Sequence, residues 1–427
     1  MKSRLALLGG AKAVTKAPVD RWTKFTPQLK QAVLALLERG VTTIGDGSGV
    51  VGEFETAFAK MVGVRRALAM NSGTATLHSA CFAAGVGPGA EVIVPTYTWH
   101  ASVTPILHCG ATPVFCDVDA RSLTADPADI ERRITPRTRA LCVVHVFGNV
   151  CDMDAIMDIV TRHKLTLIED CSHAHGAKWK GRPVGSFGAV GCFSMQGAKA
   201  VSGGEAGVAV TDRDDIFDRM VLLGHFGRKR TGADPAIVCI GDMSLGAKYR
   251  PHAWAIAMAN EELKRLPELN ARRTANYEYL NQCLKGCEGV ETVEPLPGAE
   301  RAAYLEFKFK LSPKALKKAN RDRIVEAMKA EGAPITADRY SNQNYTYGLL
   351  HAAPLFTTFD RRSLGGVFYD PTRPEQELGK KPPSLPVAED LATRLITVPA
   401  YTDVERDSLA QVADAMRKVV DNLDDLS

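Results

Sequence analysis

The chain has 427 residues, of which 45% are hydrophobic and 24% are charged, and its formal net charge is +4. This is the composition of an ordinary globular protein that is long enough for two domains. The positive charge is too small and too dispersed to indicate a nucleic-acid-binding protein, and no segment approaches the roughly 18 apolar residues of a membrane span.

The ten cysteines indicate neither a metal site nor a disulfide framework. They include no C-x-x-C pair and no Cys/His cluster at the spacing of metal ligands. The first residues, MKSRLALLGGAKAV, contain two basic residues and a brief apolar stretch but not the long apolar region of a secretory signal. We therefore expect a cytoplasmic protein with reduced thiols and no bound metal.

Short apolar strands alternate with helical patterns between about residues 50 and 212. Such alternation is typical of βαβ units and predicts an α/β fold with a large, mostly parallel sheet flanked by helices. In chain order we expect a helix at 52–64, a strand at 67–70, a helix from 71–74 to Ala84, strands at 91–94, 112–116 and 140–146, a helix at 153–164, and strands at 165–170, 189–195 and 207–211. These seven strands would form one sheet.

The pattern after residue 250 predicts a smaller α+β domain. We expect long helices at 252–266 and 268–286, a strand at 302–310, a helix at 321–332 and a terminal helix at 405–423. The stretch 363–388 is rich in glycine, proline and charge, which predicts an extended surface loop or flap. The chain is thus predicted to divide into a large domain at 1–250, which includes an N-terminal arm, and a small domain at 251–427.

Two segments place an acid and a lysine where α/β proteins bind ligands. The apolar run 165–168 ends in Glu169 and Asp170, and the carboxyl ends of such strands face the ligand crevice. Glu169 would point to the opposite side of the strand, so Asp170 is the preferred carboxylate. Further along, Lys199 is surrounded by glycine and alanine. A carboxylate for the ring nitrogen and an amine for a Schiff base are what pyridoxal phosphate requires.

The turn Asn71-Ser72-Gly73-Thr74 lies between a predicted strand and a predicted helix. Backbone N–H groups and the helix dipole favour an anion there, and the hydroxyls of Ser72 and Thr74 are further donors to a cofactor phosphate. An ordinary helix cap explains the same residues about as well. Ser194 could bind the same phosphate from a neighbouring strand end, or it could be a satisfied core serine.

The remaining candidates also have simpler interpretations. Trp99 follows a strand end and could stack on a pyridine ring, although a buried core tryptophan is the alternative. His173 could contact the ring or its phenolic oxygen, or it could merely be packed, and His175 is assigned only a packing role. Taken alone, Lys199 would be a surface lysine and Asp170 a strand-end or capping residue.

The segments around Asp170 and Lys199 resemble motifs of the DegT–StrS family of sugar and aminocyclitol aminotransferases. IEDCSHAHGA contains D-x-x-[QH]-x-H-G-A, and FSMQGAKAVSGGE contains F-S-x-x-x-x-K-x-x-x-x-G-E. Further matches, among them LALLGGAKAV, MNSGTATLHSA and LPVAEDLATRLITVPAYTD, extend over almost the whole chain. The resemblance implies fold type I, the aspartate aminotransferase fold, with pyridoxal 5′-phosphate as cofactor. It also implies a homodimer whose active sites are completed by the partner subunit.

The resemblance assigns a role to each candidate residue. Lys199 forms the internal aldimine, and Asp170 pairs with the pyridinium nitrogen. His173 lies near the ring oxygen, and Trp99 stacks on the ring. Gly73 and Thr74 of the turn bind the phosphate together with Ser194 of the neighbouring strand end.

One segment departs from the family pattern. The usual Asn-Tyr-Arg, whose asparagine reaches the partner's phosphate, is here Lys248-Tyr249-Arg250. Lys248 from the partner subunit would bind the phosphate as a point charge, and this form resembles the cyclitol-handling branch. The retained Lys199 argues against the family's dehydratases, in which histidine takes its place.

The implied reaction is ping-pong transamination. L-glutamate or L-glutamine donates the amino group, Lys199 transfers the proton as general base and acid, and a ketone of a cyclitol or small keto sugar is the acceptor. The pathway would be the biosynthesis of an antibiotic-type aminocyclitol or amino sugar. Two alternatives remain open: a nucleotide-linked keto sugar as acceptor, and a non-catalytic regulatory protein that binds the cofactor. Whichever acceptor is used, we expect its site to be shaped by the segment 336–384, with Tyr340, Tyr345, Tyr347 and His351.

Overall fold

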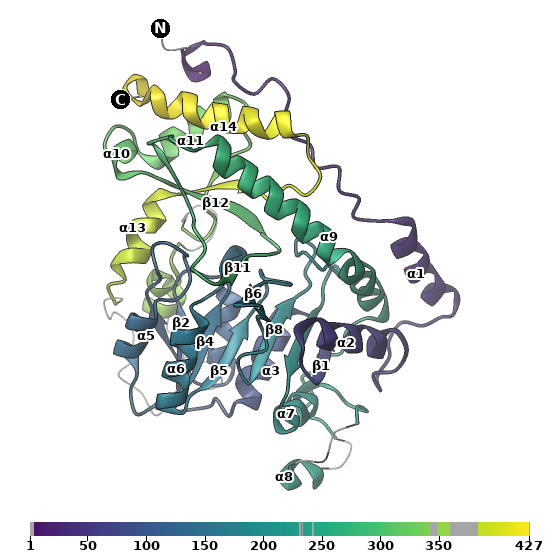
Figure 1. Cartoon of the computed structure of the whole chain (residues 1–427). Coiled ribbons are helices and arrows are strands. Elements are labelled where there is room, and N and C mark those ends of the chain that lie inside the picture. The colour runs from purple at the N-terminus through teal and green to yellow at the C-terminus, as the bar shows by residue number, and fades with distance from the viewer. Residues whose placement is uncertain are drawn as a thin grey trace.

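The computed structural model describes residues 4–229, 232, 234–240, 243–341, 348–358 and 383–426. Figure 1 shows a large sheet flanked by helices and a second group of strands and helices stacked on it, joined by the long helix α9. Most of the predicted flap lies outside the described residues, as do Tyr345 and Tyr347 of the predicted acceptor segment. In the described part of the chain, no helix has the length and apolar character needed to cross a membrane.

The large sheet contains seven strands, which confirms the prediction, in the order β1-β9-β8-β5-β4-β2-β3. Its neighbouring strands pair in parallel except at β9, which is antiparallel to both β1 and β8. The strands are β1 (Arg66–Met70), β2 (Glu91–Pro95), β3 (Thr112–Cys116), β4 (Thr138–Val144), β5 (Thr166–Asp170), β8 (Val190–Ser194) and β9 (Gly207–Thr211). Each lies within about two residues of its expected position.

Helices cover both faces of this sheet, which explains why its strands are continuous apolar runs. Val92 and Val94 of β2 pack into one core and Ile93 into the other, because successive side chains of a strand point to opposite faces. The surrounding helices are α2 (Gly49–Val62), α3 (Gly73–Ala83), α4 (Thr104–His108), α5 (Pro127–Arg133), α6 (Met153–His163) and α7 (Asp214–Gly224), and the short helix α8 (Pro235–Val238) packs against α7.

The second group is built on a four-stranded antiparallel sheet in the order β10-β12-β14-β13. Its strands are β10 (Val290–Thr292), β12 (Glu306–Leu311), β13 (Thr336–Ala337) and β14 (Leu395–Pro399), and its helices are α10 (Pro313–Leu316), α11 (Arg321–Ala330), α12 (Pro354–Thr357), α13 (Pro386–Arg394) and α14 (Arg406–Asp421). A small third sheet joins β6 (Lys178–Trp179), β7 (Arg182–Pro183) and β11 (Ala299–Glu300). The domain division between residues 250 and 251 stays a prediction.

Two predictions in this half were wrong in part. The strand expected at 302–310 begins only at Glu306, because Ala303 and Tyr304 have positive φ angles of 67° and 39°, outside the strand region. Residues 386–388, expected at the end of the flap, are instead the first turn of α13.

The two helices expected at 252–266 and 268–286 are a single helix, α9 (Ala253–Cys283). Pro267 lies inside it, and a proline normally ends or distorts a helix because it lacks an N–H group. Contacts with α1 (Pro27–Glu38), α2 and α14 stabilise α9 on either side of the proline. Tertiary packing thus overrides the local signal that predicted a break.

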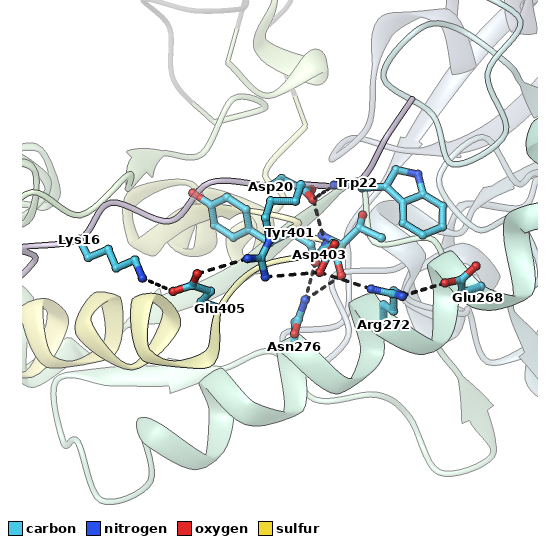
Figure 2. A network of polar contacts seen from close by, with 11 residues as sticks. Lys16, Asp20, Trp22, Glu268, Arg272, Asn276, Tyr401, Asp403 and Glu405 are labelled. Atoms are coloured by element: carbon cyan, nitrogen blue, oxygen red, sulfur yellow. Dashed lines mark hydrogen bonds and ion pairs between the residues drawn. The ribbon is translucent and has the colours of Figure 1, made fainter. Parts of the chain in front are cut away.

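The N-terminal arm, residues 4–24, runs along α9 and contacts the segment before α14 (Figure 2). Lys16 and Arg21 both form ion pairs with Glu405. The carboxylate of Asp20 accepts hydrogen bonds from the N–H groups of residues 402–403, at 3.0 and 2.9 Å. The arm therefore ties the beginning of the chain to its last helix.

Candidate active site

The carboxyl ends of the parallel strands border a cavity of about 390 Å³. Eight of the nine predicted site residues line it: Ser72, Gly73, Thr74, Trp99, Asp170, His173, Ser194 and Lys199. They follow or end β1, β2, β5 and β8, whose carboxyl ends lie at the same edge of the sheet.

Asp170 is the last residue of β5 and is only 4% exposed. Its Oδ2 accepts a hydrogen bond from the hydroxyl of Ser102 at 2.7 Å, and its Oδ1 accepts one from the N–H of Ser172 at 3.0 Å. The hydroxyl of Ser102 lies 2.8 Å from that of Thr98. These contacts fix the carboxylate while leaving acceptor capacity for a further N–H donor in the cavity.

Lys199 lies in the turn after β8, where its backbone N–H donates a hydrogen bond to the backbone carbonyl of Gln196 at 2.8 Å. Burial lowers the pKa of Lys199 to about 8, although the negative charge of Asp170 opposes this shift. The positive charge of Arg339 lowers the pKa further. The amine is therefore more readily deprotonated than that of an ordinary lysine, as nucleophilic attack on an aldehyde requires.

The turn at the start of α3 packs against the end of β8, and we call this arrangement an anion cradle because its backbone and hydroxyl donors suit an anion. A Cβ atom on Gly73 would lie 2.6 Å from the Cβ of Ser194, so glycine alone permits this approach. Ser72 is also a helix cap, because its Oγ accepts from the N–H of Ala75 at 3.0 Å. Its O–H hydrogen, and the hydroxyls of Thr74 and Ser194, remain candidate donors to a phosphate.

His173 presents a neutral imidazole to the cavity. Burial and the nearby positive charges of Lys199 and Arg339 hold the pKa of His173 well below its usual value. Its Nδ1 accepts a hydrogen bond from the N–H of Phe147 at 3.2 Å, so the ring proton resides on Nε2. His173 is thus a hydrogen-bond donor, which suits a ring oxygen that carries negative charge.

Trp99 and Tyr340 form an aromatic wall of the cavity. Trp99 is 45% exposed, and its ring centroid lies 6.1 Å from that of Tyr340. Tyr340 in turn stacks on His173 with an interplanar angle of 16°. His175 packs in the core against Phe58 and Phe193, which confirms the packing role expected for it.

Lys248 does not line the cavity of its own chain. It is exposed and has a positive φ of 57°. The neighbouring Tyr249 anchors this segment, because its carbonyl accepts from the N–H of Asn71 at 2.8 Å and its hydroxyl lies 2.6 Å from Nδ1 of His78. Whether Lys248 reaches a partner's phosphate stays a prediction.

Arg339 and Tyr340 reach the cavity from the segment after β13. The sequence gives no local signal for Arg339, because only the stacking of the small sheet on the large one brings it there. Tyr340 was expected near the acceptor site, and it does line the cavity. His351, named with it, is instead buried against Thr96, with its Nδ1 2.8 Å from the threonine hydroxyl.

A buried polar cluster lies on the other side of β5. Its members His145, Glu169 and Cys171 place their possible metal-binding atoms within 4.8 Å of one another. The carboxylate of Glu169 already accepts three hydrogen bonds at 2.7 to 2.8 Å, from the backbone N–H groups of residues 185, 187 and 188. These bonds occupy the carboxylate, and we interpret the cluster as structural support for the strand that ends in Asp170.

Comparisons with known proteins identify one family of enzymes. The model of the DegT/DnrJ/EryC1/StrS aminotransferase family matches residues 24–356. The L-glutamine:scyllo-inosose aminotransferase of Streptomyces griseus is 34% identical, with 100% of each chain covered. An aminotransferase structure from Psychrobacter cryohalolentis has a TM-score of 0.80 at 28% identity, covering 95% of this chain and 100% of its own. DesI, solved with its TDP-sugar product, has a TM-score of 0.79 at 28% identity, covering 99% and 97%.

Proposed function

This chain belongs to the DegT/DnrJ/EryC1/StrS aminotransferase family, whose members are pyridoxal-phosphate-dependent, and we propose that it aminates a ketone of a cyclitol. The amino donor is L-glutamine or L-glutamate. The observation that carries the proposal is the pairing of Lys199, with its lowered pKa, and the fixed carboxylate of Asp170 in one cavity with an anion cradle. The choice of a cyclitol acceptor rests on the named Streptomyces griseus relative.

The residues in the cavity fit pyridoxal 5′-phosphate. Lys199 supplies the amine that would hold the cofactor, and Asp170 the partner for its ring nitrogen. The cradle at Gly73 suits the phosphate, the Nε2–H of His173 suits the ring oxygen, and the ring of Trp99 offers a stacking surface. When bound, the cofactor supplies a sink for the electron pair left at the substrate carbon.

Lys199 is the group that moves the proton in the proposed reaction. With a pKa of about 8, its amine can take a proton from the donor's α-carbon and deliver it to a neighbouring carbon near neutral pH. The negative charge of Asp170 would favour the protonated ring nitrogen, and hydrogen bonds from Ser102 and Ser172 hold the carboxylate in one orientation.

A cytoplasmic homodimer with shared active sites is part of the proposal. The segment before Lys248 exposes four large apolar side chains, which is typical of a surface that another chain covers. They are Phe226, Val238, Met243 and Leu245. Lys248 would then contribute its charge to the phosphate bound in the partner.

The test begins with absorbance spectroscopy of the purified protein after addition of pyridoxal phosphate. The wild type should develop the visible band of lysine-bound cofactor, Lys199→Ala should not, and Lys317→Ala, an exposed lysine, should retain it. L-glutamine should bleach the band, and scyllo-inosose should restore it and yield an aminocyclitol detectable by mass spectrometry. A wild type that ignores the cofactor would contradict the proposal.

The second candidate acceptor is a nucleotide-linked keto sugar. The similarity to DesI, which was solved with a TDP-sugar product, favours it. Offering the bleached enzyme scyllo-inosose and a TDP-linked keto sugar separates the two, because only the true acceptor restores the band at low concentration. The regulatory alternative predicts no amino transfer to either compound.

A further inference from the structure

The proposed reaction requires one cavity to accept two substrates, of which only the amino donor has a carboxylate. The amino donor carries an α-carboxylate, whereas a ketocyclitol carries no charge. An ionised carboxylate that leaves water needs a cation or several donors at its new site. Among the residues that the structure describes, Lys199 and Arg339 are the lysine and arginine side chains that line the cavity. Since Lys199 is committed to the cofactor, Arg339 is the cation left for the donor.

The guanidinium of Arg339 forms an ion pair with Glu306, which is buried. Glu306 has a second cation, because its Oε2 also accepts a hydrogen bond from Nζ of Lys308 at 2.6 Å. Lys308 is fully buried, and it donates further to Asp338 and, at 2.7 Å, to the hydroxyl of Thr397. The carboxylate of Glu306 is thus shared between a partly exposed cation at the cavity and a fully buried cation behind it.

This sharing lowers the cost of moving Arg339 away from Glu306, because Lys308 stays hydrogen-bonded to Glu306 while it also serves Asp338. Removing one member of a buried ion pair is strongly destabilising when the other charge is left uncompensated. Here Glu306 would keep Lys308 if Arg339 turned towards a bound carboxylate. Arg339 is 38% exposed and also lines a second hollow of about 690 Å³, so it has space to reorient.

The position of Arg339 suits contact with a substrate. The neighbouring Tyr340 stacks on His173 and tilts against Trp99, so Arg339 lies beside the wall that would face the cofactor ring. Asp338 fixes this wall: it accepts from the hydroxyl of Tyr97 at 2.9 Å and from the N–H of Tyr340 at 3.1 Å.

From this geometry we propose that Arg339 binds the α-carboxylate of the amino donor, while Lys308 compensates Glu306. When the uncharged acceptor occupies the cavity, Arg339 returns to Glu306 and its charge is neutralised. Arg339 is thereby a donor-binding residue, and Glu306 and Lys308 are positioning residues that let one site serve both half-reactions. This inference rests on the proposed function.

The test compares the two half-reactions in Arg339→Gln and in Arg162→Gln, an exposed arginine of α6 far from the cavity. The amino donors are L-glutamine and L-glutaminol, in which a hydroxymethyl group replaces the carboxylate. In Arg339→Gln, the L-glutamine concentration for half-maximal bleaching should rise roughly 10- to 100-fold, as expected for the loss of charge-assisted hydrogen bonds. That for L-glutaminol should not change, and Arg162→Gln should match the wild type with both donors.

Glu306→Gln and Lys308→Met test the exchange itself. Glu306→Gln leaves the charge of Arg339 uncompensated, so scyllo-inosose should be bound more weakly while L-glutamine is bound at least as tightly. Lys308→Met leaves Glu306 with Arg339 alone, so L-glutamine should be bound more weakly even though Arg339 is present. Because Lys308 is buried, the thermal unfolding of Lys308→Met is measured together with its substrate binding. If Lys308→Met fails to fold, the binding measurements on Glu306→Gln test the exchange independently.

The outcomes separate this inference from the proposed function. A wild type without a lysine-dependent band would overturn the proposed function. A normal band that L-glutamine bleaches equally well in the wild type and in Arg339→Gln would overturn only the role of Arg339. Equal losses with L-glutamine and L-glutaminol would also overturn it, because they would indicate a general distortion of the cavity.

Discussion

The reactivity of Lys199 depends on two opposing effects at a single amine. Burial disfavours its charged form and lowers the pKa, whereas the carboxylate of Asp170 favours the charged form. Burial prevails, and the pKa falls to about 8. The cavity thus brings the pKa of Lys199 close to neutral pH, where the amine can both accept and release a proton.

The rate at which the cofactor-free enzyme captures pyridoxal phosphate should therefore follow the deprotonation of Lys199. The amine is unprotonated above its pKa, so the rate should rise with pH and reach half of its maximum near pH 8. Stopped-flow absorbance would measure it. Asp170→Asn should move the profile to lower pH, because the charge that raises the pKa is gone. A profile centred near the 10.4 of an exposed lysine, about two units higher, would contradict this account.

Glu169 should matter for stability rather than for chemistry. Its carboxylate accepts three backbone hydrogen bonds, and in Glu169→Gln an amide NH₂ would face at least one of these donors. We expect a loss of about 1 to 3 kcal/mol in the free energy of unfolding. Urea denaturation would measure it, with Glu288→Gln, an exposed partner of Lys314, as the control. A variant as stable as the control would show that the cluster contributes little.

At the scale of elements, the sequence predicts what depends on local patterns. The seven large-sheet strands are apolar runs between turns, and their carboxyl ends identify eight cavity residues without any tertiary information. Arg339 could not be predicted as a cavity residue from the sequence. It follows the two-residue strand β13 and reaches the cavity only because one sheet packs on the other. The break predicted at Pro267 fails for the same reason, since contacts with neighbouring helices hold α9 together.

A substitution of Pro267 therefore measures how much a proline in its interior destabilises α9. Pro267→Ala restores a backbone N–H in the helix interior, and we expect the free energy of unfolding to rise by up to about 3 kcal/mol. Pro313→Ala is the matched control, because Pro313 occupies the first turn of α10, where a proline costs little. Calorimetric unfolding would compare the two. A destabilised Pro267→Ala would mean that the packing of α9 is adapted to the proline.

At the scale of the whole molecule, the proposed dimer makes each active site depend on two chains. Lys199 and Lys248 would then serve one site from different subunits. Mixing Lys199→Ala with Lys248→Ala protein and allowing subunit exchange should create hybrid dimers in which one site is intact. With random exchange about a quarter of all sites would be intact, so activity should recover towards that level. No recovery, despite exchange shown by native mass spectrometry, would place both lysines in the same subunit's site or remove Lys248 from the mechanism.

The N-terminal arm should contribute to stability although it lies outside the cavity. Asp20→Ala removes the acceptor for the N–H groups of residues 402–403, and we expect a loss of about 1 to 3 kcal/mol. The arm should also be cleaved faster by a protease. Asp158→Ala, which removes an exposed carboxylate on α6, should change neither property. An arm that stays equally resistant would show that its other contacts suffice.

The contacts of the arm (Figure 2) also set an order of events during synthesis. Lys16 precedes its partner Glu405 by 389 residues, so the arm leaves the ribosome long before its docking surface exists. At typical rates of translation this interval lasts on the order of tens of seconds. The large sheet can assemble during that time, whereas the arm must wait for the final helix. Docking of the first residues would then be among the last steps of folding, and a ribosome stalled before Glu405 would hold a chain whose arm is still open to proteases.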